Sequence, residues 1–252
     1  MSKVRAAAPG SSLIDEYARL LALAAHEFRT PAGVVGGYLR MLQLETDTPL
    51  PDRQRKMVDE AAKSCAWLIA LVGQLSEIGK IDDGTAPMAL ETFDLFADLE
   101  DVASRVHDAD DRGVRLQLAG MTAGARVVGD RHRLNAAFEA LFRAVLRERP
   151  SAVAILGDRR VVTRDGRTSA IVVIASAPDV ERAYDAVAQP FDENRGGIGL
   201  SLPIARRVIE QAGGRVWSPT PADAEDRGLR SAVVVSIPST TERDPRGPRA
   251  DS

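Results

Sequence analysis

The N-terminal part of the chain has a regular pattern of apolar side chains, and this pattern most constrains its fold. Apolar residues and one proline recur at alternating spacings of four and three residues: Tyr17, Leu21, Ala24, Phe28, Pro31, Val35, Tyr38 and Leu42. This spacing predicts a long helix that packs in a bundle. After a proline-containing turn at 46–52, a second helix with a similar pattern is predicted to end near Ile81. Two helices with one apolar seam each cannot cover themselves well, so we expect a homodimeric four-helix bundle.

His26 lies on the side of this helix that is farthest from the apolar seam, which predicts an imidazole facing water. Glu27 is its neighbour, Thr30 lies one turn further along, and Pro31 is predicted to kink the helix. Neutral histidine is a nucleophile at physiological pH, and a neighbouring carboxylate can accept its other ring proton. An ordinary surface histidine is the alternative, and the surrounding residues argue against it.

The run from His26 to Pro31 resembles the phosphoacceptor box of sensor histidine kinases, which has a His-Glu-aromatic-Arg-Thr-Pro sequence on its dimerisation helix. The resemblance implies that His26 accepts a phosphoryl group, while Glu27 orients the imidazole and accepts its proton. It implies that Arg29 offsets phosphoryl charge. Thr30 matches the family position that positions water when a response regulator is dephosphorylated. The implied partners are response regulator receiver domains, with an upstream hybrid or sensor kinase as a further candidate.

The rest of the chain predicts a domain of mixed helices and strands. One helix is expected to begin near Thr92 or Asp94, and three others are expected at 133–147, 180–188 and 202–212. Strands are expected at 114–118, 127–128, 152–156, 161–163, 169–175, 215–218 and 232–237. Helices on one face of a mixed sheet form an α/β two-layer sandwich. The order of the elements resembles the ATP-binding domain of histidine kinases. We therefore predict a dimeric four-helix-bundle phosphoacceptor domain followed by a kinase-type α/β domain.

The 252 residues are predicted to divide into five segments. These are a disordered N-terminus at 1–10, a dimerisation and phosphoacceptor hairpin at 11–82, a linker at 83–91, the α/β domain at 92–239 and a disordered tail at 240–252.

A glycine-rich segment that contains Gly196, Gly197, Gly199 and Leu200 precedes the last predicted helix. Glycines let backbone N–H groups approach phosphates, and a helix N-terminus adds the positive end of its dipole. A plain turn is the alternative. Together with the Ile-Ala-Arg-Arg-Val-Ile-Glu helix that follows, the segment resembles the second glycine box of histidine kinases, which implies nucleotide binding.

The other nucleotide-binding boxes of the family are not matched. Ala140 and Ala144 stand where the resemblance places asparagines, the second of which binds Mg²⁺. Ala175 stands where it places the aspartate that recognises adenine, and Asp179 is expected to cap the next helix. Only residues 192–195 separate Pro190-Phe191 from the glycines, which is too short for a lid over a nucleotide. We expect this domain to bind Mg-ATP poorly or not at all.

The net charge bears on which partners are expected. The charge of −3, from 33 basic and 36 acidic residues, gives no sign of binding to nucleic acid or to an anionic membrane. The single Cys65 excludes an internal disulfide. Because no membrane-spanning run and no signal-peptide pattern is found, we expect a cytoplasmic protein whose input comes from a partner.

These features predict a phosphorelay protein that exchanges a phosphoryl group between His26 and a response-regulator aspartate, as a phosphotransferase with a defective ATP site. It would need no cofactor beyond Mg²⁺ on the partner receiver domain. Two alternatives stay open. One is an ATP-dependent histidine kinase with an atypical site, in which Glu139 or Glu148 would bind Mg²⁺. The other is a non-catalytic pseudokinase scaffold, which has no need of the His26, Glu27 and Thr30 combination.

Overall fold

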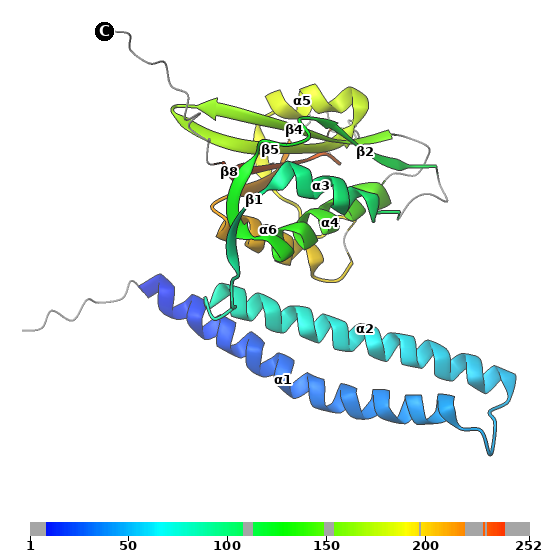
Figure 1. Ribbon diagram of the computed structural model, residues 1–252. Helices are drawn as coiled ribbons and strands as arrows, with labels where there is room; N and C mark the ends of the chain where they lie inside the picture. Colours follow the sequence, from blue (N-terminus) through cyan, green and yellow to red (C-terminus); the bar gives the residue numbers. More distant parts are fainter. Residues whose placement is uncertain are drawn as a thin grey trace, which may run out of the picture. The chain divides into compact units, whose positions relative to one another are not determined.

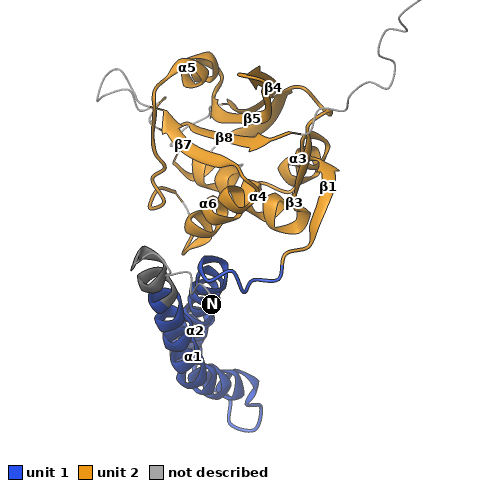
Figure 2. Ribbon diagram, turned by 90° about the vertical axis from the view of Figure 1, so that its left-hand side faces the viewer, with its two compact units in different colours: residues 1–87 blue, residues 88–252 orange. Residues whose placement is uncertain are grey.

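The structure, a computed structural model, describes residues 9–107, 113–148, 154–196, 198–219, 229 and 231–239, with side chains from Glu16 onward. The chain divides into two compact units, Met1–Pro87 and Met88–Ser252 (Figure 2). Of the segments predicted to be disordered, 1–8 and 240–252 lie outside the described residues, whereas residues 9 and 10 belong to the first helix. Within the described ranges, no helix combines the length and apolar character needed to span a membrane.

The first unit is the predicted helical hairpin. Helix α1 spans Pro9–Leu44 and helix α2 spans Asp52–Asp82 (Figure 1). α1 continues through Pro31 without a break, and Figure 1 shows that it bends along its length.

The two helices approach each other closely at small residues of α1. Ala18, Ala25 and Ala32 are buried, and the thiol of Cys65 on α2 donates to the Ala32 carbonyl at 3.2 Å. A Cβ added at Gly79 of α2 would lie 3.1 Å from the backbone of α1, so the helix backbones approach closely. Large members of the predicted seam remain exposed in the single chain: Tyr17, Phe28, Val35, Tyr38 and Leu42.

The second unit contains two sheets. Strands β1 (Leu90–Asp94) and β3 (Arg126–Asp130) form an antiparallel pair. A six-stranded sheet has the order β2-β4-β5-β8-β7-β6, with β2 parallel to β4 and the other pairs antiparallel. Its strands are β2 (Arg115–Gly120), β4 (Ala154–Arg164), β5 (Arg167–Ser176), β6 (Ala188–Pro190), β7 (Arg215–Pro219) and β8 (Val233–Pro238).

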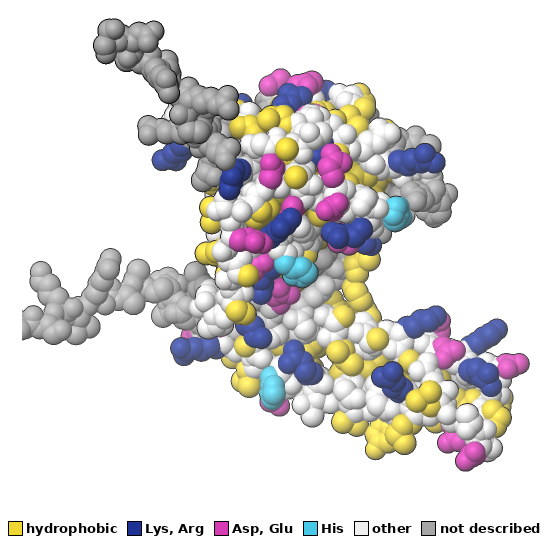
Figure 3. All heavy atoms as spheres, in the orientation of Figure 1, with side chains coloured by type: hydrophobic (Ala, Val, Ile, Leu, Met, Phe, Trp, Pro, Cys, Tyr) yellow, Lys and Arg dark blue, Asp and Glu magenta, His cyan; other side chains and the backbone are white. Residues whose placement is uncertain are grey.

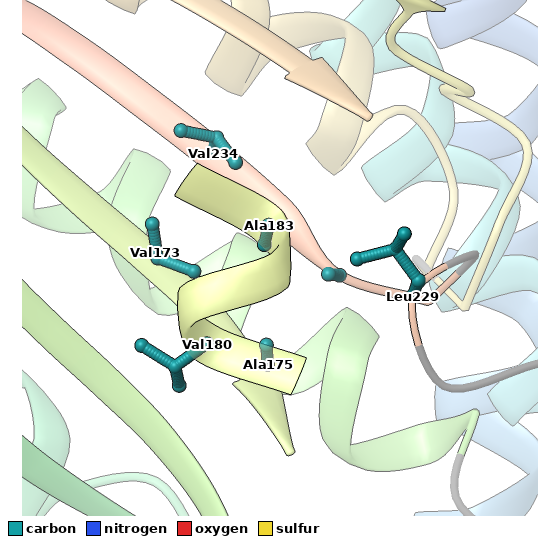
Figure 4. Close-up of a cluster of buried hydrophobic side chains, with 7 residues drawn as sticks. Val173, Ala175, Val180, Ala183, Leu229 and Val234 are labelled. Carbon is teal, nitrogen blue, oxygen red and sulfur yellow. The ribbon is translucent and has the colours of Figure 1, made fainter. Parts of the chain in front are cut away.

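Helices cover both faces of the large sheet, unevenly. α3 (Leu95–Ser104), α4 (Arg131–Arg147) and α6 (Ser201–Gln211) lie on one face, and α5 (Val180–Asp185) lies on the other (Figure 1). Under α5, Val173 and Ala175 of β5 pack with Val180, Ala183 and further buried side chains (Figure 4). The predicted two-layer α/β class is confirmed. The prediction that all helices share one face is wrong, because β5 is apolar on both faces and its second face is covered by α5.

Two aspartates fix the starts of the helices on the main layer. The Asp94 carboxylate accepts hydrogen bonds from the backbone N–H groups of Phe96 and Ala97, which caps α3. The Asp130 carboxylate accepts from Arg133 at the start of α4 and from Ala89 before β1. These caps explain why helices begin directly after β1 and β3.

Three regions differ from the sequence-based prediction. Residues 90–94 form β1, paired with β3, where a linker end and a helix start were predicted. The two strands predicted at 152–156 and 161–163 belong to the single strand β4 within its described range. The helix predicted at 180–188 ends at Asp185, because residues 188–190 pair with β7 as β6. In each case strand pairing between distant segments decides the outcome, and a local pattern does not reveal such pairing.

Candidate functional site

The predicted phosphoacceptor residues lie on one exposed stretch of α1. His26, Glu27, Arg29 and Thr30 are all solvent-exposed, directly beside the buried Ala25. The helix thus fixes its backbone against α2 through Ala25 while it presents the imidazole to solvent. A partner active site can reach a nucleophile in this position from outside.

Among the described residues, His26 and Glu27 form no hydrogen bond or ion pair, with each other or with a third residue. Neighbouring side chains on a helix diverge by about 100°, so Glu27 points away from the His26 ring in this arrangement. The expected orientation of the imidazole by Glu27 therefore requires a rotamer change or a partner that brings the two groups together.

A broad apolar surface runs along the same helix, apart from the small residues that contact α2. Its side chains are between 45% and 67% exposed: Tyr17, Leu20, Leu23, Phe28, Val34, Val35, Tyr38, Met41 and Leu42. Figure 3 shows hydrophobic side chains gathered along this helix. We call these nine residues the α1 apolar stripe. Contiguous exposed apolar surface of this kind marks an interaction site.

The glycine-rich segment of the second unit packs against the end of α4. Gly196 has a φ of +36°, and a Cβ at this position would collide with the carbonyl oxygen of Ala144. Gly197 lies outside the described residues. Gly199 has a φ of +59° and is exposed, and Leu200 is the N-cap residue of α6, its carbonyl accepting from the Ile204 N–H at 3.1 Å.

Arg195, directly before Gly196, is buried, and its guanidinium group contacts three other residues. Its Nε and Nη2 donate to the two carboxylate oxygens of Glu148, at 3.0 and 2.7 Å. Its Nη1 donates to the Ala232 carbonyl at 3.1 Å, and Nη2 also contacts the Ser231 carbonyl. The side chain, only 5% exposed, therefore fills the space between the end of α4 and the start of β8.

The positions where the family has nucleotide ligands hold apolar groups. Ala144 is 1% exposed and Ala175 is fully buried, the latter within the cluster beneath α5 (Figure 4). Asp179 does not cap α5 as predicted. Its buried carboxylate instead accepts from the Ser176 hydroxyl and, at 2.8 Å, from Arg182. The backbone before α5 is a 3-10 turn, so Asp179 already has helical φ and ψ and cannot serve as an N-cap.

Both acidic residues considered as substitute Mg²⁺ ligands have basic partners. Glu139 accepts from Arg143 one turn along α4, with a closest distance of 2.8 Å, and Glu148 is paired with Arg195. The role of Arg195 was not predicted from the sequence. A lone arginine next to a short segment gives no indication that it pairs with a carboxylate far away in the chain.

A long helical hairpin with an exposed histidine, followed in the chain by an α/β sandwich with a glycine-rich helix start, is the arrangement of histidine phosphoacceptor proteins with a kinase-type domain. Residues 17–84 match the His Kinase A (phospho-acceptor) domain. The chain is 26% identical over 238 residues to the swarming motility regulation sensor protein RssA of Serratia marcescens, covering 90% of this chain and 49% of the relative. It is 28% identical over 249 residues to an uncharacterised sensor-like histidine kinase of Rhizobium meliloti (strain 1021), covering 92% and 45%.

Solved structures show the same fold. Full-length ShkA in complex with AMPPNP has a TM-score of 0.60 at 23% identity, over 88% of this chain and 45% of that chain. The histidine kinase ThkA in complex with the response regulator protein TrrA has a TM-score of 0.52 at 18% identity, over 89% and 62%. Residues 17–84 therefore form a histidine kinase phosphoacceptor domain, and the chain is similar to sensor histidine kinases over most of its length. It spans about half the length of the curated relatives named above.

Proposed function

We propose that the protein is a phosphotransferase, which exchanges a phosphoryl group between His26 and a response-regulator aspartate, rather than an ATP-dependent kinase. The main support is the position of Arg195 and Gly196. Arg195 pairs with Glu148 at the end of α4, and Gly196 lies against the carbonyl group of Ala144. The family resemblance predicts Mg²⁺ and the phosphates at this position. A nucleotide could enter this space only if the ion pair between Arg195 and Glu148 broke.

The chemistry of the lining supports the same proposal. Mg²⁺ in an ATP site requires oxygen ligands, and the methyl group of Ala144 supplies none. The carboxylates of Glu139 and Glu148 are already neutralised by arginines. The methyl group of Ala175 cannot accept a hydrogen bond from the adenine amino group. Autophosphorylation by ATP would need both the Mg²⁺ ligand and the adenine contact.

Phosphoryl transfer to His26 needs little from the rest of this chain. One imidazole nitrogen attacks phosphorus, the bond from phosphorus to the aspartyl oxygen of the receiver breaks, and the carboxylate of the receiver is released. The proton of the other ring nitrogen can be shared with Glu27. Arg29, on the same exposed stretch, offsets charge on the phosphoryl oxygens. The reverse direction uses the same atoms.

The same proposal includes a homodimer and a receiver-domain partner. A second copy would cover the α1 apolar stripe and complete a four-helix bundle. The complex of ThkA with the response regulator protein TrrA supports a receiver-domain partner by likeness of fold. The exposure of His26 suits such a partner, because the transferring aspartate must reach it from outside the hairpin.

The test compares two phosphoryl donors on the full chain. The protein is incubated with Mg²⁺ and γ-labelled ATP, or with receiver domains labelled on aspartate, and the variants His26→Ala and His132→Ala run beside the wild type. His132 is an exposed histidine at the start of α4 and serves as the matched control. We expect label on the protein from a receiver domain only, lost in His26→Ala and retained in His132→Ala.

Each other outcome has a definite meaning. Label from ATP that depends on His26 would make the protein an autokinase and refute the proposal for Arg195 and Ala144. No label from either donor, with dimers intact, would favour the pseudokinase scaffold.

A further inference from the structure

The large sheet has a cavity on the face that α5 covers only in part. α5 spans only 6 residues, and the long β4–β5 hairpin extends beyond it (Figure 1). The cavity has a volume of about 250 Å³. It is lined by Val162, Arg164, Arg167, Ser169, Ile171, Tyr184, Trp217, Val234 and Ser236. Its walls therefore combine apolar and aromatic side chains with two guanidinium groups, which is the usual composition of a small-molecule site.

The two arginines lie in an arrangement that is unfavourable without an anion. Arg164 and Arg167 are directly opposite each other on β4 and β5, next to the tight turn at Asp165 and Gly166. Like charges at directly opposed strand positions repel each other. In the part of the chain that the structure describes, neither arginine forms an ion pair, although Asp165 is close in sequence. A bound anion would remove this repulsion and could accept hydrogen bonds from both guanidinium groups.

Two aromatic side chains, Tyr184 and Trp217, form another part of the cavity lining, and neighbouring residues contact both of them. The Tyr184 hydroxyl donates to Asp158 at 2.9 Å, and the Arg160 guanidinium lies 4.0 Å from the centroid of its ring. Burial, followed by the hydrogen bond to Asp158, raises the pKa of Tyr184 far above its ordinary value, so this wall stays neutral. Trp217 forms another wall, with the Arg215 guanidinium 5.9 Å from its ring centroid. These rings offer a flat surface on which a planar ligand can stack.

We propose that this cavity binds a small aromatic anion, a carboxylate or a phosphate monoester, with its ring against Trp217 and Ile171 and its charged group between Arg164 and Arg167. The volume limits the ligand to one or two fused rings, because pockets that bind drug-sized ligands have volumes of about 300–1,000 Å³. The site is independent of His26 and of the glycine-rich segment. It gives the kinase-like domain a ligand-binding role that does not depend on Mg-ATP.

The test is titration calorimetry of the full 252-residue chain with 2-naphthoate, 2-naphthyl phosphate and the neutral 2-naphthamide. We expect at least one of the two anions to bind at least tenfold more tightly than the amide, because only the anions can form charge-assisted hydrogen bonds with the two guanidinium groups. The better anion identifies the charged group. If the amide binds as tightly as both anions, or if no probe binds at 1 mM, the proposal is wrong.

Variants locate the site. Arg164→Gln, Arg167→Gln and Trp217→Leu should each weaken binding of the better anion at least tenfold. Arg115→Gln is the matched control, an exposed arginine on β2 outside the cavity, and should change affinity less than twofold. The melting temperature of each variant shows whether its fold is intact. Equal losses in Arg115→Gln and Arg164→Gln would show non-specific attraction to the surface and overturn the proposal.

Discussion

The guanidinium of Arg195 and the carboxylate of Glu148 form a two-point ion pair across the kinase-like domain, with nitrogen–oxygen distances of 3.0 and 2.7 Å. The pair joins the segment after Phe191 to the end of α4, and two backbone carbonyls satisfy the remaining donors of the arginine. Buried ion pairs are strong only when such additional hydrogen bonds are made. The arginine thus holds the segment after Phe191 against the end of α4.

Removal of one partner of this pair should destabilise the second unit strongly. Arg195→Met leaves the Glu148 carboxylate partly buried without a counter-charge, so we expect a loss of about 3 kcal/mol in the free energy of unfolding. The double variant Arg195→Met, Glu148→Leu should recover at least half of that loss. Urea unfolding followed by Trp217 fluorescence in a Trp67→Phe background measures both.

The matched control for this prediction is Arg143→Met. Arg143 pairs with Glu139 one turn away on the same helix, and both side chains are about one-third exposed (34% and 33%). Such helical pairs contribute about 0.3–0.5 kcal/mol. A loss in Arg195→Met no greater than that in Arg143→Met would show that the buried pair does not hold this segment.

The α1 apolar stripe should control dimerisation. Tyr38 is 65% exposed in the single chain, and burial of an aromatic side chain contributes about 1.5–3 kcal/mol. We expect Tyr38→Glu to raise the dimer dissociation constant at least 100-fold, because it removes this contribution and introduces a charge into the interface. Sedimentation equilibrium measures the change. Arg40→Glu, two residues away and exposed, should change the constant less than threefold. Dimers of equal strength in both variants would contradict an interface along this stripe.

Glu27 should affect the rate of phosphoryl transfer without affecting assembly. A neighbouring general base typically contributes 10²–10⁴-fold to a rate, so Glu27→Gln should slow transfer from a labelled receiver domain to His26 by about 100-fold. Quench-flow labelling measures this rate. Glu16→Gln, an exposed glutamate of the same helix, should leave it unchanged. If Glu27→Gln transfers at the wild-type rate, the imidazole does not need this carboxylate, in keeping with the absence of a contact between them in the free protein.

The parts of this protein that were predictable from sequence are those set by local periodicity. The hairpin of α1 and α2 followed from apolar spacing, and the exposure of His26 followed from its position opposite the seam. Apolar spacing shows which residues avoid water but not which neighbour covers them. Alanines of α1 are buried against α2, whereas Phe28 and Tyr38 stay exposed in the single chain.

Long-range contacts account for what sequence could not reveal. The partnership of Arg195 with Glu148 joins residues 47 positions apart, and nothing in either local sequence indicates it. The failed prediction for Asp179 has a local cause instead, because the 3-10 turn before α5 gives this residue helical φ and ψ. The cavity beside Trp217 draws its lining from β4, β5, α5, β7 and β8, and only the assembled sheet brings these together. Arrangements that depend on one helix were predictable, and arrangements that depend on several elements were not.

Asp98 should make the stability of the second unit dependent on pH. Its carboxylate accepts from Arg131 at 2.6 and 2.7 Å and from Asn135 at 3.0 Å. Burial raises the pKa of Asp98, but the hydrogen bonds from Arg131 and Asn135 and the charge of Arg131 outweigh it and leave the pKa below its ordinary value. A carboxyl group with a lowered pKa in the folded state stabilises that state above its unfolded pKa of about 3.9. The stabilisation is lost as pH falls through the lower, folded-state pKa.

Asp98→Asn tests this assignment. Hydrogen bonds to charged groups contribute about 1.5–3 kcal/mol, and Arg131 is half exposed, so we expect a loss near the lower end of this range, about 1.5 kcal/mol, at pH 7. The difference from the wild type should be constant above pH 5 and should shrink as pH falls below 4, because the wild-type carboxylate becomes protonated while the amide does not titrate. Thermal unfolding at pH 7, 5, 4 and 3 measures the difference, with the exposed Asp101→Asn of the same helix as control. A difference that stays the same at pH 3 and pH 7 would mean that packing at this position, rather than the charge of Asp98, stabilises the contact between α3 and α4.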